Sequence, residues 1–259
     1  MTPRINNTTE EHEIFLRPFV SHVIFELKFS NLFYIEDRIG DFQVKILEKY
    51  EESSLLFRRN FLVGDVGPDF NLADAVEKNS QESKKIWQFS NEISKLNITS
   101  NSLDLSTKSY KNYRSSGDDS FRSLIDFVVE KFLEVTEIPK VSRLGLRYVN
   151  LCKIQDMNTQ NFNDWYKTSL PIERFKLQDI DDMSFKTDVK INNDKMIYQE
   201  GIKKIKNEWK YVLDLDGYIE NIDSSLVMET ADRLHSEIYT EFNKNMKEPA
   251  LDYMRRENE

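Results

Sequence analysis

Residues 141–154, VSRLGLRYVNLCKI, decide the fold of this chain. The stretch follows a strongly periodic helical segment and contains two arginines, Arg143 and Arg147, on either side of Gly145. Residues four apart on a strand share one face and lie about 13 Å apart, at about 3.3 Å per residue. The stretch therefore predicts a central strand with two cations on one face.

The segment before this strand predicts a helix over 121–135. Asp119 or Ser120 is suited to cap its first turn, and Pro139 marks its end. The apolar residues recur at helical spacing and form one broad face. They are Phe121, Leu124, Ile125, Val128, Val129 and Phe132.

The N-terminal part predicts strands, one helix and a loop. Val23, Phe25 and Leu27 share one face of the first strand by alternation. Asn101-Ser102 is a turn signal. The expected elements are a strand 19–29, a helix 39–52, a strand 55–64, a mobile loop 65–85, and strands 86–90 and 95–107.

The C-terminal part predicts three strands and the longest helix. Asp216-Gly217 is a turn or strand-end signal, and Asp223 or Ser224 caps the helix. Pro249 stops or kinks that helix. The expected elements are a polar connection 155–182 with a short helix, strands 183–191, 195–205 and 208–219, and a helix to 246.

Together these elements predict an α+β fold with a largely antiparallel sheet. Two long helices packed on one face would bury both of their apolar sides, and the order of elements suggests two-part internal pseudo-symmetry. No linker rich in Gly or Ser separates the halves. We therefore expect a single domain over 14–259, preceded by a disordered or frayed N-terminus over 1–13.

Composition excludes several classes of protein. With 39% hydrophobic residues, 17 Phe and 11 Tyr, the chain can form a sizeable core and is not intrinsically disordered. A net charge of −9 makes nucleic acid an unexpected partner. The single cysteine, Cys152, excludes an internal disulfide. No apolar run approaches membrane-spanning length and the start has no secretion signal, so we expect a cytoplasmic protein without a membrane span.

Three segments occur in this order in one known family. They are FVSHVIFELKF near the N-terminus, VSRLGLRYVN in the middle, and LDLDGY followed by LHSEIYTEF near the C-terminus. The chain resembles a sporadically distributed bacterial family of conserved proteins of unknown function and roughly this length. The resemblance implies spread by horizontal transfer, which is typical of mobile or defence islands, and it assigns no catalytic residue.

The candidate binding residues are Arg143, Arg147, Asp214 and Asp216. The two arginines, with Gly145 as an open floor between them, are suited to a phosphate, a nucleotide or an acidic peptide. The two aspartates share a strand face and could hold a divalent cation, although a third ligand is missing. The alternative is a structural role, in which the arginines form ion pairs with these carboxylates. The sequence favours this alternative.

The other candidates for chemistry are weaker. His12, His22 and His235 lie at no spacing typical of a metal site, and Cys152 has no adjacent activating group. One basic and aromatic cluster is suited to nucleic acid only if its rings are exposed, and alternation with Leu213 instead predicts buried rings. The cluster is Lys203, Lys204, Lys206, Trp209, Lys210 and Tyr211.

No nucleophile motif, phosphate loop or metal-ligand cluster stands out, so we expect no catalytic residue and no cofactor. The leading hypothesis is a non-enzymatic binding protein: the sensor, regulator or partner subunit of a bacterial phage-defence (antiviral) or toxin–antitoxin-like module. It would act by contact with a partner protein, encoded by a neighbouring gene. The alternative is a sensor of an anionic nucleotide or phosphate near Arg143 and Arg147. A third hypothesis is an enzyme with a dispersed site.

Overall fold

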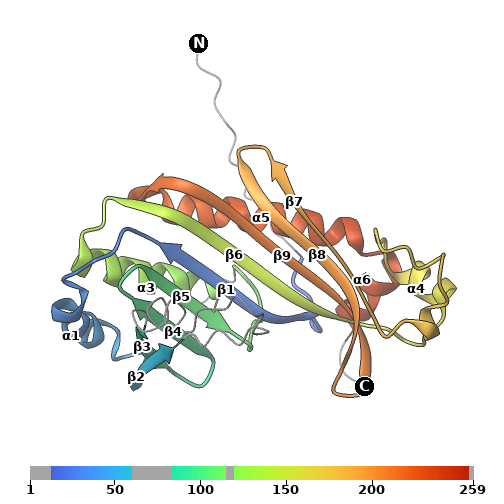
Figure 1. The fold of residues 1–259 in the computed structure, drawn as a ribbon, viewed down its shortest axis with the longest axis horizontal. Helices are drawn as coiled ribbons and strands as arrows, with labels where there is room; N and C mark the ends of the chain where they lie inside the picture. The colour runs from blue at the N-terminus through green and yellow to red at the C-terminus, as the bar shows by residue number, and fades with distance from the viewer. Residues whose placement is uncertain (1–12, 60–82, 115–119, 257–259) are drawn as a thin grey trace, which may run out of the picture.

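A computed structural model describes residues 13–59, 83–114 and 120–256 (Figure 1). Within them the chain forms one nine-stranded sheet with the order β2-β3-β4-β5-β1-β6-β9-β8-β7. Every neighbouring pair of strands is antiparallel. Together with five helices, this confirms the predicted α+β class. Residues 65–82 of the predicted loop and most of the predicted frayed start lie outside the described residues, whereas residues 83–85 are the start of a strand rather than part of a loop.

Most strands follow the predicted segments. The segment 95–107 forms two strands with a turn between them instead of one, and the strand predicted over 55–64 begins at Glu52, while residues 60–64 lie outside the described part. The 141–154 stretch belongs to a central strand, as predicted, with β1 on one side and β9 on the other. The strands are β1 (Val20–Lys28), β2 (Glu52–Arg59), β3 (Ser83–Ser90), β4 (Ser94–Thr99), β5 (Ser102–Thr107), β6 (Lys140–Lys153), β7 (Asp182–Ile191), β8 (Asp194–Ile205) and β9 (Glu208–Asp223).

The helices differ from the predicted ones mainly at their ends. Ser120 caps α3 as predicted, because its side chain accepts a hydrogen bond from the main-chain N–H of Ser123. The helix ends where Glu137 takes a left-handed conformation, with φ of 51°. The helices are α1 (Ile35–Ile46), α3 (Phe121–Thr136), α4 (Thr159–Trp165), α5 (Val227–Asn245) and α6 (Glu248–Arg255).

The prediction of a turn or strand end at Asp216-Gly217 is wrong. Asp216-Gly217 is not a turn, because β9 continues through both residues to Asp223. A Cβ at Gly217 would lie 3.2 Å from Cδ1 of Ile238 on α5 and 3.6 Å from Leu234. The glycine therefore allows α5 to approach the strand closely. Close approach of another part of the chain is a common reason for glycine within a strand.

The prediction that Pro249 stops or kinks the long helix is also wrong. The long helix already ends at Asn245, and Pro249 lies in the first turn of the separate helix α6. Proline is well tolerated there, since the first N–H groups of a helix have no partner within it. α6 brings Tyr253 and Met254 back to the start of the chain, where the N–H of Arg17 donates to the carbonyl of Met254 at 2.9 Å.

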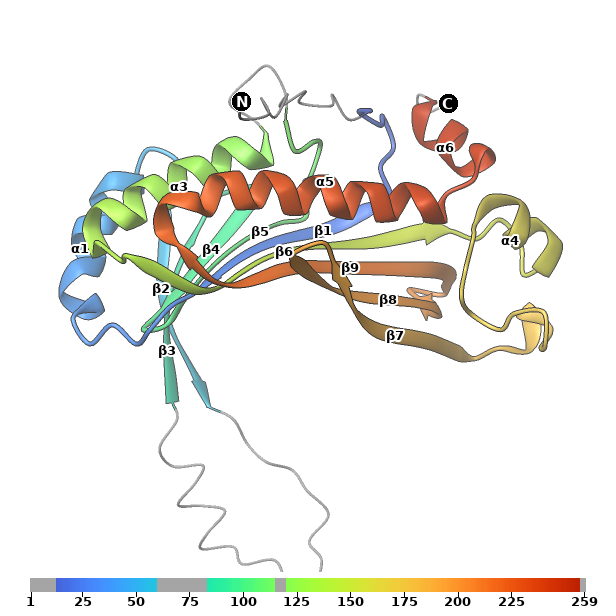
Figure 2. The same ribbon diagram turned by 90° about the horizontal axis from the view of Figure 1, so that it is seen from above.

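The two faces of the sheet differ in chemistry. Val23, Phe25 and Leu27 of β1 are buried in the core cluster, while the alternate residues are half-buried or exposed. In Figure 2, α5 runs along one side of the sheet and follows β6 and β9. We call the opposite side, which carries Ile24, Glu26 and Lys28 of β1, the open face.

Candidate functional site

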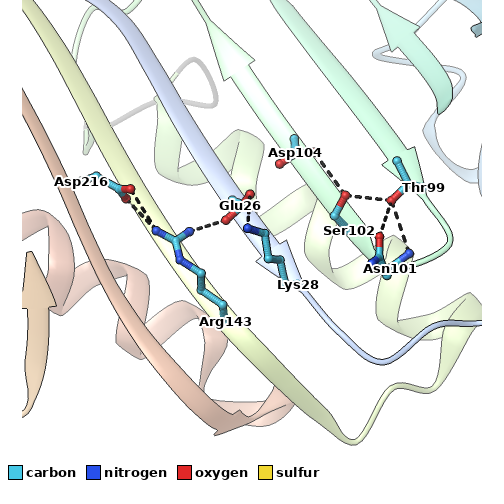
Figure 3. A network of polar contacts seen from close by, with 8 residues as sticks. All are labelled: Glu26, Lys28, Thr99, Asn101, Ser102, Asp104, Arg143 and Asp216. Atoms are coloured by element: carbon cyan, nitrogen blue, oxygen red, sulfur yellow. Dashed lines mark hydrogen bonds and ion pairs between the residues drawn. The ribbon is translucent and has the colours of Figure 1, made fainter. Parts of the chain in front are cut away.

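The register of the central strands places a polar network on the open face. Glu26 of β1 lies directly opposite Gly145 of β6, which in turn lies opposite Tyr218 of β9. Arg143 lies two residues before Gly145, and its side chain extends along the strand over the glycine. Figure 3 shows the guanidinium of Arg143 between Glu26 and Asp216.

Arg143 connects three strands. Its Nη1 donates to Glu26, and its Nη2 lies 3.1 and 3.0 Å from the two carboxylate oxygens of Asp216. Its Cζ lies 4.6 Å from the ring centroid of Tyr218. Because its side chain is only 18% exposed, most of its charge is neutralised by protein groups rather than by water.

Gly145 is not the open floor that the sequence suggested. A Cβ at this position would lie 2.9 Å from Cζ of Arg143 and closer still to Nη1. The space left by the missing side chain is therefore filled by the guanidinium of Arg143. Any larger residue would displace that guanidinium and separate it from Glu26 and Asp216.

Arg147 forms the second ion pair of the open face. Its Nε donates to Asp214 at 2.8 Å and its Nη2 at 2.5 Å, which is the bidentate geometry that arginine forms with carboxylates. Its side chain is 44% exposed, whereas that of Asp214 is 12% exposed. The hydrogen bonds to Asp214 raise the pKa of Arg147.

All four predicted site residues thus come together, as two arginine–carboxylate pairs. This is the alternative that the sequence favoured, and it leaves the predicted ligand-binding role a prediction. Burial raises the pKa of Asp216, although Arg143 opposes that shift. An anionic ligand at either arginine would have to compete with a carboxylate that is already in place.

Sequence reasoning missed Glu26 and Asp104. The two carboxylates lie directly opposite each other on β1 and β5. Glu26 pairs with Arg143 and with Lys28 at 3.3 Å, whereas Asp104 forms no ion pair within the described residues and accepts only from Ser102 Oγ at 3.4 Å. Burial, and next the charge of Glu26, raise the pKa of Asp104 to about 6.

Replacing Asp104 with asparagine should make the stability of the protein less dependent on pH. An aspartate in an unfolded chain has a pKa of about 3.9. Because the folded-state pKa is higher, Asp104 contributes stability that is complete below about pH 4 and is lost as the pH rises through about 6.

Asp104→Asn is therefore expected to raise the free energy of unfolding at pH 7 by on the order of 2 kcal/mol, with little effect at pH 3.5. Urea unfolding of both proteins at the two pH values measures this difference. Equal effects at both pH values would contradict the assignment.

The histidines do not form a site together. His22 lies on the open face, where burial, then Lys108 and Arg147, lower its pKa. His235 is buried on α5, with its Nδ1 3.0 Å from the hydroxyl of Tyr148 and its ring stacked on Tyr113 at 3.9 Å. His12 lies outside the described residues.

The remaining candidates are mostly structural. Burial raises the pKa of the Cys152 thiol, which fits the predicted role of a small buried side chain. Tyr211 is fully buried, as the alternation predicted, whereas Trp209 is only partly buried. Among residues 13–59, 83–114 and 120–256, no group of three His, Cys, Asp or Glu side chains is arranged to hold a metal ion.

No known protein family and no curated protein matches this chain significantly. The resemblance to a sporadically distributed bacterial family therefore stays a prediction. Within the described part of the chain, no helix is both long enough and apolar enough to cross a membrane.

Proposed function

We propose that this chain is a non-enzymatic binding protein that contacts a partner protein through the open face. The observation that carries the proposal is the ion-pair network centred on Arg143 and Arg147, which lies on the side of the sheet away from α5. A row of charged groups fixed by neighbouring strands gives a rigid polar surface, and such surfaces set the orientation and specificity of protein partners.

The charges indicate the kind of partner. The network pairs the carboxylates of Glu26, Asp214 and Asp216 with Arg143, Arg147 and Lys28, Asp104 adds a further carboxylate beside Glu26, and the whole chain carries a net charge of −9. A partner with basic and hydrogen-bonding groups would meet these carboxylates with complementary charge. Half-exposed Arg147 can contribute from the rim, since guanidinium groups are common in protein interfaces.

We further propose that the partner belongs to a bacterial phage-defence or toxin–antitoxin-like module, in which this chain is the sensor, regulator or partner subunit. The support is the family resemblance alone, because scattered distribution is typical of such modules. The product of an adjacent gene is the first partner to examine. This proposal also includes a cytoplasmic location, for which the single cysteine is the support.

Reversing one charge tests the interface. The chain is co-expressed with the product of a neighbouring gene and purified by a tag on one protein only. Arg147→Glu is expected to reduce the co-purified partner at least about tenfold, because it breaks the bidentate pair that orients Asp214 and places a second carboxylate beside it on the contact surface. Lys244→Glu on α5, whose side chain is 63% exposed, is the matched control and should have no effect. Equal loss with both variants would contradict the proposal.

A second candidate is a sensor of an anionic nucleotide or phosphate at the same arginines. The exposure of Arg147 favours it, since an anion could reach the outer side of this guanidinium without entering the core. In that case Arg147→Ala should weaken phosphate or nucleotide binding at least about tenfold and leave the thermal melt nearly unchanged. A lower melting temperature with unchanged residual affinity would retire this candidate.

We also infer that α3 and α5 pack together on one sheet face and that the two halves are related by pseudo-symmetry. Each half begins with a central strand, continues through a helix and an antiparallel meander that returns to that strand, and ends with a long helix. A two-fold axis between β1 and β6, perpendicular to the sheet, would place both long helices on the same face. An experimental structure with them on opposite faces would contradict this.

A further inference from the structure

A hollow of about 900 Å³ lies where the chain start, the end of β6 and helix α6 meet. Its walls come from residues 16–19 and Ser21, from Leu151 and residues 153–157, from the start of β9 at 208–210, and from Tyr253 of α6. The volume falls within the roughly 300–1,000 Å³ of small-molecule pockets. Along β6 its nearest lining residue, Leu151, lies four residues beyond Arg147, or roughly 13 Å, and the hollow is lined by neither Arg143 nor Arg147, so it is distinct from their ion pairs.

Two of the three cations that line this hollow lack, within the described part of the chain, the carboxylate partners that Arg143 and Arg147 have. Arg17 and Lys153 form no ion pair with any residue that the structure describes, and Nε of Arg17 is buried and donates to no acceptor. The third cation, Lys210, is held by Glu208 at 2.6 Å. An anionic group inside the hollow would give the guanidinium of Arg17 and the ammonium of Lys153 the charged partner that no carboxylate of the described residues supplies.

The surroundings hold Arg17 in place. Its main-chain N–H donates to the carbonyl of Met254, and the next residue but one, Phe19, accepts a hydrogen bond from the N–H of Leu151 at 2.8 Å. The guanidinium lies 5.6 Å from the ring centroid of Tyr253, which Phe19 stacks against. A cation held this way loses little conformational entropy on binding, so the site is preorganised.

The other groups that line the hollow indicate which chemical class of ligand fits it. Trp209 is partly buried and offers an aromatic surface beside the cations, and Nζ of Lys153 lies 5.1 Å from the Tyr253 ring. Asp156 and Glu208 also line the hollow and can accept from hydroxyl or amino groups but disfavour a highly charged ligand. The lining thus combines anion-binding groups, an aromatic surface and hydrogen-bond acceptors.

We propose that this hollow binds a nucleoside monophosphate, with its phosphate at Arg17 and Lys153 and its base against Trp209. The ribose hydroxyls and the amino groups of a base match the carboxylate acceptors. The site is separate from the ion pairs of Arg143 and Arg147 and would give the protein a small-molecule input in addition to its partner contact.

Calorimetric titration of the whole chain with the four common nucleoside monophosphates tests the proposal, with inorganic phosphate and adenosine as the matched part-ligands. At least one nucleotide is expected to bind more tightly than either part-ligand. Arg17→Gln and Lys153→Gln should each weaken that binding at least about tenfold. Arg38→Gln on α1 removes the same charge outside the hollow. It is the control and should leave the affinity for the nucleotide unchanged.

The outcomes are separable. Lys153 is exposed, so its variant keeps the test valid even if Arg17→Gln fails to fold. No binding of any nucleotide to the unaltered protein would overturn the proposal, and so would binding that is insensitive to Lys153→Gln. Phosphate binding as tight as nucleotide binding would overturn the assignment of a nucleotide. Co-purification of a partner protein does not depend on this hollow, so the two proposals fail independently.

Discussion

Replacing Glu200 with alanine is expected to lower the free energy of unfolding by about 4 kcal/mol. Glu200 lies on β8 and is fully buried. Its carboxylate accepts from the Thr168 hydroxyl at 2.7 Å, the Ser169 main-chain N–H at 2.6 Å and the Tyr211 hydroxyl at 2.7 Å. Each buried donor left without an acceptor costs about 1–3 kcal/mol. The loss of stability caused by Glu200→Ala should therefore exceed the loss caused by removing any one of its three hydrogen-bond donors.

Urea denaturation of three variants separates the contributions. Tyr211→Phe alone removes one donor and should cost about 1 kcal/mol. The double variant should cost less than the sum of the two single ones, because the Tyr211 hydroxyl is then absent when the carboxylate is lost. A cost of less than 1 kcal/mol for Glu200→Ala would contradict the view that this carboxylate holds the connection after α4 against the sheet.

Local pattern alone predicted most of the secondary structure. Alternation located β1 and β9, since one side of each strand meets the core and the other does not. The cap at Ser120 was predictable because a serine before an apolar helical face satisfies orphan N–H groups. Gly217 was misread for the opposite reason: its role depends on Ile238 of α5, which no local window contains.

The candidate site was predictable only in part. Ion pairs between the two arginines and Asp214 and Asp216 were the alternative that the sequence favoured, but which arginine meets which aspartate depends on the register of β9 beside β6. Glu26 is separated from Arg143 by 117 residues. Periodicity gives the face of a residue but not the order of strands in a sheet, so Glu26 could not be linked to Arg143 from the sequence.

Arg17 shows the same limit more strongly. It precedes the first predicted strand and has no pattern around it that distinguishes it from other arginines. Its position depends on α6, which returns from the other end of the chain and places Tyr253 beside it. An unpaired cation can be recognised only when all of its neighbours in the fold are known, because only then is it clear that no carboxylate lies beside it.

Truncating Phe132 to alanine is expected to lower the free energy of unfolding by about 3–5 kcal/mol. Phe132 is fully buried on α3, with its ring centroid 5.4 Å from that of Phe29 and 5.7 Å from that of Phe42. Phe42 in turn lies 5.9 Å from Phe89 of β3. The four rings join α3, α1 and the sheet, so they cannot all move to fill the cavity.

An exposed phenylalanine in the same region provides the control. Phe33, just before α1, is 91% exposed, so Phe33→Ala should change the stability by less than about 0.5 kcal/mol. Phe132→Leu should fall between the two variants, because leucine fills part of the space. Guanidinium chloride denaturation at one pH measures all three. If Phe132→Ala were as mild as Phe33→Ala, α3 could not be packed through this face, and the aromatic cluster would not be what joins the first half of the sheet to its helices.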